Sequence, residues 1–358
     1  MQKNKGKVFV GLSGGVDSSV SAYLLREAGY DVVGVFIRTW QPPELPCTWR
    51  AERRDAMRAA AHLGIPFMQC DLVETYRTEV AEYMIREYRA GRTPNPDVFC
   101  NKEVKFGGFV RFALEHGADA IATGHYAQIV THDGVQVLAQ GLDQSKDQSY
   151  FLWTLTNEQL EHVMFPVGHL HKDAVRKIAE EIALPNATKK DSQGVCFIGK
   201  LDMKDFLRTY VGPDKIGEVY SVEGVLVGTH PGAHLFTLGE RHGFTVTDKN
   251  PSDEPYYVVA KDLEKNTLTV SHDITAYGHE HVSRNIVLTD ILSAYTPNSG
   301  KKYSAVIRYH GTPIPCSVVP IVGATAKITF DYPDATLASG QSVVVYDEGR
   351  VMLAGIKQ

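Results

Sequence analysis

The sequence predicts an α/β fold with a parallel sheet in the first half of the chain, followed by all-β segments. Short apolar runs alternate with helical patterns as far as about residue 126, which is typical of a parallel sheet covered by helices on both faces. After Gly217 the pattern changes to short β-runs separated by Gly, Pro and Asn turns. A Gly-Gly turn between the first strand and the first helix also indicates a ligand site at the carboxyl ends of the strands.

The first half of the chain supplies the elements of the predicted sheet and its helices. Apolar runs predict strands at residues 7–12, 31–37, 67–70 and 119–123, and apolar residues at helical spacing predict helices at 18–28, 51–63, 75–89 and 103–116. Asp133-Gly134 lies between two β-like runs and predicts a hairpin. Further helices are predicted at 157–163 and 171–182, and a segment rich in Lys, Ser and Gly at 185–200 predicts a loop.

The end of the chain predicts a small barrel. Its β-runs are evenly spaced and lie at residues 286–288, 303–309, 315–319, 326–330, 342–346 and 352–356. We therefore expect three domains. Residues 1–199 form an α/β domain, residues 200–280 a small β-containing central domain, and residues 281–358 a C-terminal β-barrel.

Composition excludes several classes of protein. The 358 residues are 22% charged and 43% hydrophobic, which argues against a disordered chain. No apolar run approaches the roughly 20 residues of a membrane helix, and the basic N-terminus leads into a strand pattern rather than a signal-peptide core. A net charge of −5 means that any RNA surface must be local. The expected location is the cytoplasm.

Ser13-Gly14-Gly15-Val16-Asp17-Ser18 is the most specific local feature. Glycines let backbone N–H groups approach an anion, and the helix N-terminus adds its positive dipole end. Asp17 is a candidate for recruiting Mg²⁺. The alternative is a plain strand–helix turn. The loop lacks the lysine of the loops that cleave the terminal phosphate of ATP, and it resembles the PP-loop of the N-type ATP pyrophosphatases, which cleave between the α- and β-phosphates.

Five cysteines occur without a C-x-x-C pair, so a zinc site is not expected: Cys47, Cys70, Cys100, Cys196 and Cys316. Cys100 and Asp97 follow a proline-rich loop and precede a helix predicted to begin near Lys102, and a helix N-terminus lowers the pKa of a thiol. Cys196 follows two lysines and a glycine, which predicts an electropositive, mobile loop. The alternative for any one cysteine is a small buried hydrophobe, and this suits Cys70 and Cys316, whereas Cys47 is ambiguous.

A wider set of segments resembles the family of bacterial tRNA-specific 2-thiouridylases. The resemblance runs in order along nearly the whole chain, through Gly11 to Ser19, Gly91 to Lys105, Ala122 to Tyr126, Gly141 to Leu152, Asp191 to Gly199, Phe236 to Gly239, Pro255 to Val259 and Gly340 to Ser342. The sequence departs from the family pattern in the loop at residues 39–50, which is less acidic than in the family, and at Arg241-His242-Gly243, where Arg-Lys-Gly is expected. These departures affect loop closure and contacts with the tRNA stem, not the reaction.

The resemblance implies a reaction and the residues that perform it. ATP, with Mg²⁺, adenylates the 2-oxo group of the wobble uridine, and sulfur arrives as a persulfide on Cys196. Cys100 serves as nucleophile or resolving thiol, in one route leaving a Cys100–Cys196 disulfide, and Asp97 acts as acid/base or orients the base. The positions that carry over for ATP are Gly11, Leu12, Ser13, Gly14, Gly15, Val16, Asp17, Ser18, Ile37 and Gly124.

The resemblance also implies contacts with the anticodon stem-loop of tRNA. Asn95, Pro96 and Asp97 match the segment that contacts the target base, which must leave its stack to reach the site. The other positions that carry over are His125, Lys146, Asp147, Gln148, Arg308, Tyr309 and Gln341, with Arg308 and Tyr309 on a barrel strand. A persulfide donor, either a cysteine desulfurase or a relay protein, is the second expected partner.

Two other functions remain open. The first is another adenylating enzyme of the same superfamily that joins a small metabolite to ammonia or an amine. Paired thiols and the RNA-matching barrel argue against it. The second is a non-catalytic RNA-binding or sulfur-carrier protein, and the intact Ser13–Ser18 loop argues against this one, because a carrier needs no nucleotide.

Overall fold

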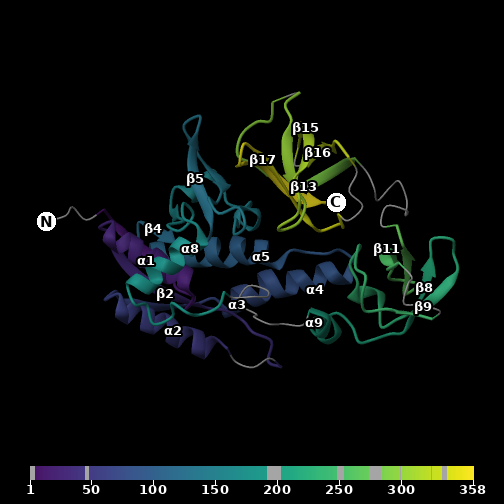
Figure 1. The fold of residues 1–358 in the computed structure, drawn as a ribbon, viewed down its shortest axis with the longest axis horizontal. Helices are drawn as coiled ribbons and strands as arrows, with labels where there is room; N and C mark the ends of the chain where they lie inside the picture. Colours follow the sequence, from purple (N-terminus) through teal and green to yellow (C-terminus); the bar gives the residue numbers. More distant parts are fainter. Residues whose placement is uncertain are drawn as a thin grey trace.

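The computed structural model describes residues 5–44, 48–191, 203–247, 254–273, 284–298, 300–323, 325–332 and 337–358. Figure 1 shows three parts. The N-terminal α/β part is purple to teal, the barrel is yellow-green, and a small green sheet lies on the far side of helices α4 and α9. Among the described residues, no helix is both long and apolar enough to cross a membrane.

A five-stranded parallel sheet organises the N-terminal part, as predicted. Its order is β3-β2-β1-β4-β7. The strands are β1 (Lys7–Gly11), β2 (Asp31–Arg38), β3 (Phe67–Asp71), β4 (Ala120–Ala122) and β7 (Val163–Met164). The sequence predicted a helix at 157–163, but that helix, α7, covers only Asn157–Leu160, and Val163 begins the edge strand. The edge strand is bound to β4 from His162 onward, because the carbonyl of His162 accepts a hydrogen bond from the N–H of Ile121 at 2.9 Å.

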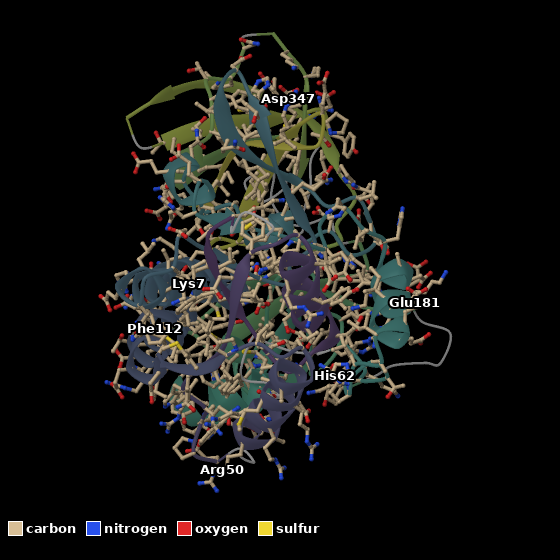
Figure 2. The ribbon with its side chains drawn as sticks, turned by 90° about the vertical axis from the view of Figure 1, so that its left-hand side faces the viewer. Lys7, Arg50, His62, Phe112, Glu181 and Asp347 are labelled. Atoms are coloured by element: carbon tan, nitrogen blue, oxygen red, sulfur yellow. The ribbon has the colours of Figure 1, made fainter. Side chains whose placement is uncertain are left out.

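Helices cover both faces of this sheet because its strands are apolar on both sides. Val8 and Val10 face one core and Phe9 faces the other. The helices are α1 (Val16–Glu27), α2 (Trp49–His62) and α8 (Lys172–Glu181) on the first face, and α3 (Val73–Tyr76), α4 (Glu82–Arg89) and α6 (Phe109–Glu115) on the second. Figure 2 shows this arrangement, with Glu181 on one side of the sheet and Phe112 on the other.

The helix that contains Cys100 begins earlier than the sequence predicted. Helix α5 (Pro96–Phe99) continues through a π-helical segment (Cys100–Gly108) into α6, and a second π-helical segment (Arg77–Ala81) joins α3 to α4. Asn95 caps α5, since its Oδ1 accepts hydrogen bonds from the N–H groups of Asp97 and Val98 at 3.2 and 3.3 Å. The predicted start near Lys102 is therefore wrong. An Asn cap followed by Pro at the first helical position is a start signal.

A closed six-stranded barrel forms the C-terminal part, as predicted. The order β13-β16-β15-β14-β17-β18 closes through pairing of β13 with β18. The strands are β13 (Asn285–Ser293), β14 (Tyr303–Val306), β15 (Ile314–Val322), β16 (Thr325–Phe330), β17 (Ser342–Asp347) and β18 (Arg350–Lys357). The predicted strand at 303–309 ends at Val306, so Arg308 and Tyr309 lie in the turn that follows rather than on a strand.

A hairpin connects the barrel to the N-terminal part. Strands β5 (Ala127–His132) and β6 (Val135–Gln140) pair across Asp133-Gly134, as predicted, and both turn residues have positive φ angles of 49° and 83°. Arg350 of β18 pairs with Ala139 of β6. The hairpin therefore extends the barrel sheet by two strands and fixes the barrel above the α/β part (Figure 1).

The central part combines one helix with a second five-stranded sheet. Its elements are α9 (Met203–Tyr210), β8 (Gly217–Ser221), β9 (Leu226–His230), β10 (Thr245–Val246), β11 (Tyr257–Asp262) and β12 (Thr267–Ser271). Helix α9 was not predicted, and it contacts α4 through a hydrogen bond from Arg89 to the Tyr210 carbonyl at 2.8 Å. The expected domain boundaries, at 199/200 and 280/281, lie outside the described residues.

Candidate active site

The Gly-rich loop lies at the carboxyl end of β1 and runs directly into α1. Gly14 has a positive φ of 76°, and a Cβ atom there would lie 2.6 Å from the carbonyl oxygen of Glu52. The hydroxyls of Ser18 and Ser19 both donate to the Gly15 carbonyl, at 3.2 and 2.9 Å. The loop is therefore folded by its own side chains, and only glycine fits at position 14.

Gly124 brings the end of β4 against the start of α1. A Cβ atom on Gly124 would lie 2.7 Å from the backbone nitrogen of Ser18, so the two backbones touch. Ile37 approaches Gly11 from β2, and its side chain is 6% exposed. Three strand ends thus meet at one edge of the sheet, where open α/β sheets bind their ligands.

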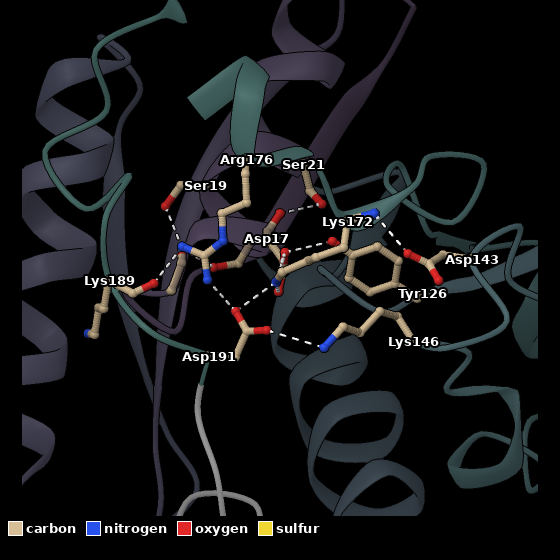
Figure 3. A network of polar contacts seen from close by, with 12 residues as sticks. Asp17, Ser19, Ser21, Tyr126, Asp143, Lys146, Lys172, Arg176, Lys189 and Asp191 are labelled. Carbon is tan, nitrogen blue, oxygen red and sulfur yellow. Dashed lines mark hydrogen bonds and ion pairs between the residues drawn. The ribbon is translucent and has the colours of Figure 1, made fainter. Parts of the chain in front are cut away.

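Asp17 is held by two residues that sequence reasoning did not single out. The hydroxyl of Tyr126 donates to Asp17 at 2.8 Å, and the ammonium group of Lys172 donates to both of its carboxylate oxygens at 2.8 and 2.9 Å (Figure 3). Lys172 is only 9% exposed. Burial and the charge of Asp17 raise the pKa of Tyr126, so its hydroxyl stays protonated as a donor. Nothing in the local sequence distinguishes Lys172 from an ordinary first residue of an amphipathic helix.

Asp191 forms a second carboxylate beside the first. Lys172 donates to it at 2.8 Å, Arg176 forms a hydrogen bond with it, and the Lys146 ammonium group lies 3.6 Å away (Figure 3). Burial alone would raise the pKa of Asp191, but the hydrogen bond from Lys172 and the charges of Arg176 and Lys146 outweigh it and lower the pKa. Lys146, matched to tRNA by sequence, thus forms an ion pair with Asp191, the carboxylate that Lys172 links to Asp17 of the Gly-rich loop.

The segment at 185–191 clamps the Gly-rich loop. Asn186 donates to the carbonyls of Gly14 and Gly15 at 3.1 Å each and to the Ser19 hydroxyl at 3.0 Å. Lys189 donates to the Gly14 carbonyl at 3.1 Å. This segment leads in sequence to Cys196, which lies outside the described residues, as does Cys47. The predicted electropositive, mobile setting of Cys196 therefore stays a prediction.

Cys100 lies in a helix and is fully buried, not in a loop before a helix. It is the fifth residue of the helix that begins at Pro96, so it lies beyond the first turn, where the dipole of a helix N-terminus acts. Cys70 in β3 and Cys316 in β15 are also buried, and burial raises both pKa values to about 12. These two thiols have the packing role that the sequence suggested.

Several residues matched to tRNA converge where the barrel meets α5. Tyr150 shares a hydrogen bond with the Asn95 side chain, and its hydroxyl donates to the Ser342 carbonyl at 3.0 Å. The ring of Tyr309 packs on Phe151, with 4.4 Å between centroids. Burial raises the pKa of Tyr309, and so do the charges of Asp147 and Asp97, which are therefore close to its ring. Arg308 is exposed.

Three other matched residues are already engaged in the protein. His125 is 8% exposed and lies between Thr123, at 2.7 Å, and Lys105, at 3.2 Å. Burial, with the charge of Lys105, holds the pKa of His125 well below its usual value, so the ring is neutral. The side chain of Gln148 accepts from the N–H of Tyr126 at 3.0 Å, and Asp147 accepts from the N–H groups of two loop residues, Gly141 and Ser149.

Gln341 lies at the rim of the barrel that contacts the loop before α5. Its side-chain oxygen accepts from the N–H of Ala338 at 3.0 Å, and nearby the N–H of Thr93 donates to the Ser339 carbonyl at 2.8 Å. A cavity of about 920 Å³ opens beside this contact, between α4, α5 and the barrel strands β13 and β18. It includes the stacked rings of Tyr83 and Phe99 but no residue of the Gly-rich loop.

A parallel sheet with Ser-Gly-Gly-x-Asp-Ser at the end of its first strand defines a PP-loop protein of the ATP-binding class. Three family models match the chain in order. They are the tRNA methyl transferase HUP domain at residues 6–200, the tRNA methyl transferase PRC-barrel domain at 204–272 and the aminomethyltransferase beta-barrel domain at 283–356.

Curated relatives match the chain over nearly its whole length. The tRNA-specific 2-thiouridylase MnmA of Nitrosomonas europaea is 43% identical over 360 residues, covering 98% of each chain. The protein of the same name from Klebsiella pneumoniae is 44% identical over 364 residues, covering 99% of this chain and 97% of the relative. The chain belongs to the family of tRNA-specific 2-thiouridylases, which are tRNA-uridine 2-sulfurtransferases.

Proposed function

We propose that this chain catalyses ATP-dependent 2-thiolation of the wobble uridine in specific tRNAs, releasing AMP and pyrophosphate. The observation that carries the proposal is the near-complete match to 2-thiouridylases in a chain whose phosphate loop is intact and clamped. Because tRNA is the substrate and the chemistry needs free thiols, we propose that the reaction takes place in the cytoplasm.

The first step is adenylation of the uridine. The uridine 2-oxygen forms a bond to the α-phosphorus of ATP, and the bond between the α- and β-phosphates breaks. Backbone N–H groups of the loop from Ser13 to Ser18 hold the phosphates, with Ile37 and Gly124 bordering the nucleotide. The developing negative charge meets fixed donors, which is the main source of catalysis in phosphoryl and nucleotidyl transfer.

Mg²⁺ fits this site as a companion of the nucleotide rather than as a resident ion. Across the described residues, no group of three or more His, Cys, Asp or Glu side chains could hold a metal. The Asp17 carboxylate offers one oxygen ligand of the kind that Mg²⁺ prefers, and phosphates and water would complete its shell. When bound there, Mg²⁺ neutralises charge on the phosphates.

The second step is sulfur transfer. Sulfur enters as a persulfide on Cys196, loaded by a cysteine desulfurase or a relay protein. In one route the terminal sulfur attacks C2 and displaces AMP, and Cys100 then cleaves the remaining S–S bond. In the other, the Cys100 thiolate attacks the Sγ atom of the Cys196 persulfide and frees the outer sulfur as hydrosulfide, which attacks C2 and displaces AMP. Both routes end in a Cys100–Cys196 disulfide, which a thiol reductant reopens.

Burial of Cys100 supports a rearrangement before this step, because a thiol with no exposed surface cannot meet a substrate. Asp97 is one helical turn away at the start of the same helix, and we propose that it orients the base or moves a proton at it. The π-helical segment that begins at Cys100 is a form of helix often found at functional sites.

Binding of tRNA uses the groups at the junction of barrel and catalytic part. Arg308 is exposed and suits a phosphate contact, and the partly buried Tyr309 suits stacking. Asn95 to Asp97 contact the flipped uridine, while His125, Asp147, Gln148 and Gln341 support this surface. Lys146 is considered separately below.

The test is pyrophosphate release with and without a tRNA transcript that carries the wobble uridine. We expect release that depends on this tRNA and is lost in Gly14→Val, because that side chain meets the Glu52 carbonyl and the phosphate site. Release driven by a small amine instead of tRNA would replace the proposal with the metabolite-adenylating alternative. Absence of nucleotide binding would favour the carrier alternative.

A further inference from the structure

Three cations converge on one carboxylate beside the Gly-rich loop. Lys172 and Arg176 lie one turn apart on α8, Lys146 comes from the turn after β6, and all three reach Asp191 (Figure 3). Their side chains are 11%, 26% and 41% exposed, respectively. Such a cluster around a single acidic group has more positive charge than that group neutralises.

The charge balance makes this a site for a larger anion. Among the described residues, the three cations form ion pairs with Asp17 and Asp191, and the Asp143 carboxylate lies in the same network. Three positive and three negative charges balance, so displacement of Asp191 from the cluster would leave a surplus of one positive charge. The N-terminus of α8 does not contribute, because the Lys172 N–H already donates to Asp143 at 2.9 Å. The affinity for an anion therefore lies in the side chains themselves.

We propose that Lys146, Lys172 and Arg176 form the subsite for pyrophosphate, and that Asp191 fills it as an internal anion in the free protein. The ligand is the β,γ-diphosphate of ATP and, after adenylation, the pyrophosphate product. The carboxylate of Asp191 accepts charge-assisted hydrogen bonds from the same donors that phosphate oxygens use. The identity of the ligand rests on the proposed function.

Position supports this ligand. Lys172 bridges Asp191 and Asp17, and Asp17 belongs to the loop that holds the phosphates. An anion that displaces Asp191 would thus lie next to the first turn of α1. In this account Lys146 serves the nucleotide, whereas its neighbours Asp147 and Gln148 stay on the tRNA side.

If the cluster had only a structural role, the expected effect of Asp191→Asn on pyrophosphate binding would be the opposite. If the three cations only hold the 185–191 segment on the loop, Asp191→Asn loosens that segment and weakens the binding of every ligand. If Asp191 competes with pyrophosphate, the same substitution removes the competitor and strengthens pyrophosphate binding. The direction of the change therefore separates the two accounts.

The experiment is calorimetric titration of the full-length protein with sodium pyrophosphate and, separately, with AMP. In Arg176→Met, loss of the charged hydrogen bond to the ligand should weaken pyrophosphate binding about tenfold and leave AMP binding within about twofold. The substitution also removes hydrogen bonds to the carbonyls of Ala187 and Lys189, and a larger fall in AMP binding would reveal loosening of that segment. Asp191→Asn should strengthen pyrophosphate binding by about threefold or more. Lys177→Met, on the same helix with a 76% exposed side chain, is the control and should change neither.

Weaker pyrophosphate binding in Asp191→Asn, or no change in Arg176→Met, would overturn the proposal. If Arg176→Met fails to fold, Lys146→Met alters the most exposed member of the cluster and should show the same selective loss. Neither titration needs tRNA or sulfur. Failure to thiolate tRNA would therefore refute the proposed function while leaving this subsite intact.

Discussion

The substitution Gly124→Ala is a direct test of the nucleotide site, because it adds one methyl group where two backbones touch. The new Cβ would lie 2.7 Å from the Ser18 nitrogen and 2.9 Å from the Asp17 carbonyl carbon. Restoring an ordinary contact near 3.4 Å requires the start of α1 to move by about 0.7 Å. The atoms that must yield are backbone, so no side-chain rotation relieves the clash.

That displacement falls on the donors that hold the phosphates. A misplacement of about 1 Å at a reacting centre lowers a rate by about 100-fold, so we expect tRNA-dependent pyrophosphate release to fall by about 10- to 100-fold. Overpacking should also destabilise the fold by about 1–3 kcal/mol. The assays are pyrophosphate release under saturating tRNA and urea unfolding of the same preparation.

Gly212→Ala is the matched control, because no atom lies within 4 Å of the added Cβ and the backbone there has no positive φ. It should leave both measurements unchanged. A Gly124→Ala protein with wild-type activity and stability would refute the reasoning, since it would mean that the end of β4 and the phosphate loop do not need this close approach.

Three further predictions concern other parts of the site. Cys100 and Cys70, both buried, should resist alkylation in the free protein, and only Cys100 should become reactive when tRNA and ATP are both present; peptide mapping would contradict this if Cys100 were modified at once without them. Because the pKa of His125 is lower in the folded state, only the unfolded chain binds this proton between about pH 6.5 and the folded-state pKa. The free energy of unfolding therefore decreases as the pH is lowered through that window, with a slope of at most about 1.4 kcal/mol per pH unit. Burial also lowers the pKa of His230, so His230 contributes to the same slope in the wild-type protein. His125→Gln should remove only the contribution of His125, measured by urea titrations at pH 5 and pH 7. Asn95→Ala should lower stability by about 1 kcal/mol through loss of the α5 cap and should raise the KM for tRNA; an unchanged KM would argue against a role at the target base.

The sequence predicted those features whose signals are local. The turn from Gly11 to Val16 is a strand, two glycines and a helix start in consecutive residues, so its structure could be anticipated without knowledge of the rest of the fold. The same holds for the hairpin at Asp133-Gly134, where the turn chemistry is contained in two residues. The positions of the barrel strands were also predicted, although the strand predicted at 303–309 extended three residues beyond the end of β14 at Val306.

The partners of the loop could not be predicted, because they come from distant parts of the chain. Lys172 approaches Asp17 across 155 positions, and Asn186 approaches Gly14 across 172. Each is an unremarkable residue in its own segment, and only tertiary packing gives it a role. The setting of Cys100 was misread for a different reason, since the cap formed by Asn95 and Pro96 was interpreted as a stiff loop.

One turn links the two halves of the proposed reaction. Residues 141–151 carry Lys146, which forms an ion pair with Asp191, and Phe151, on which Tyr309 of the barrel side packs. Between them, Asp147 holds the turn by accepting from the N–H groups of Gly141 and Ser149 at 2.9 and 3.1 Å. The hydrogen bonds of Asp147 therefore hold one short backbone segment that places Lys146 beside Asp191 and Phe151 beside Tyr309, so the proposed nucleotide subsite and the proposed tRNA surface share this turn.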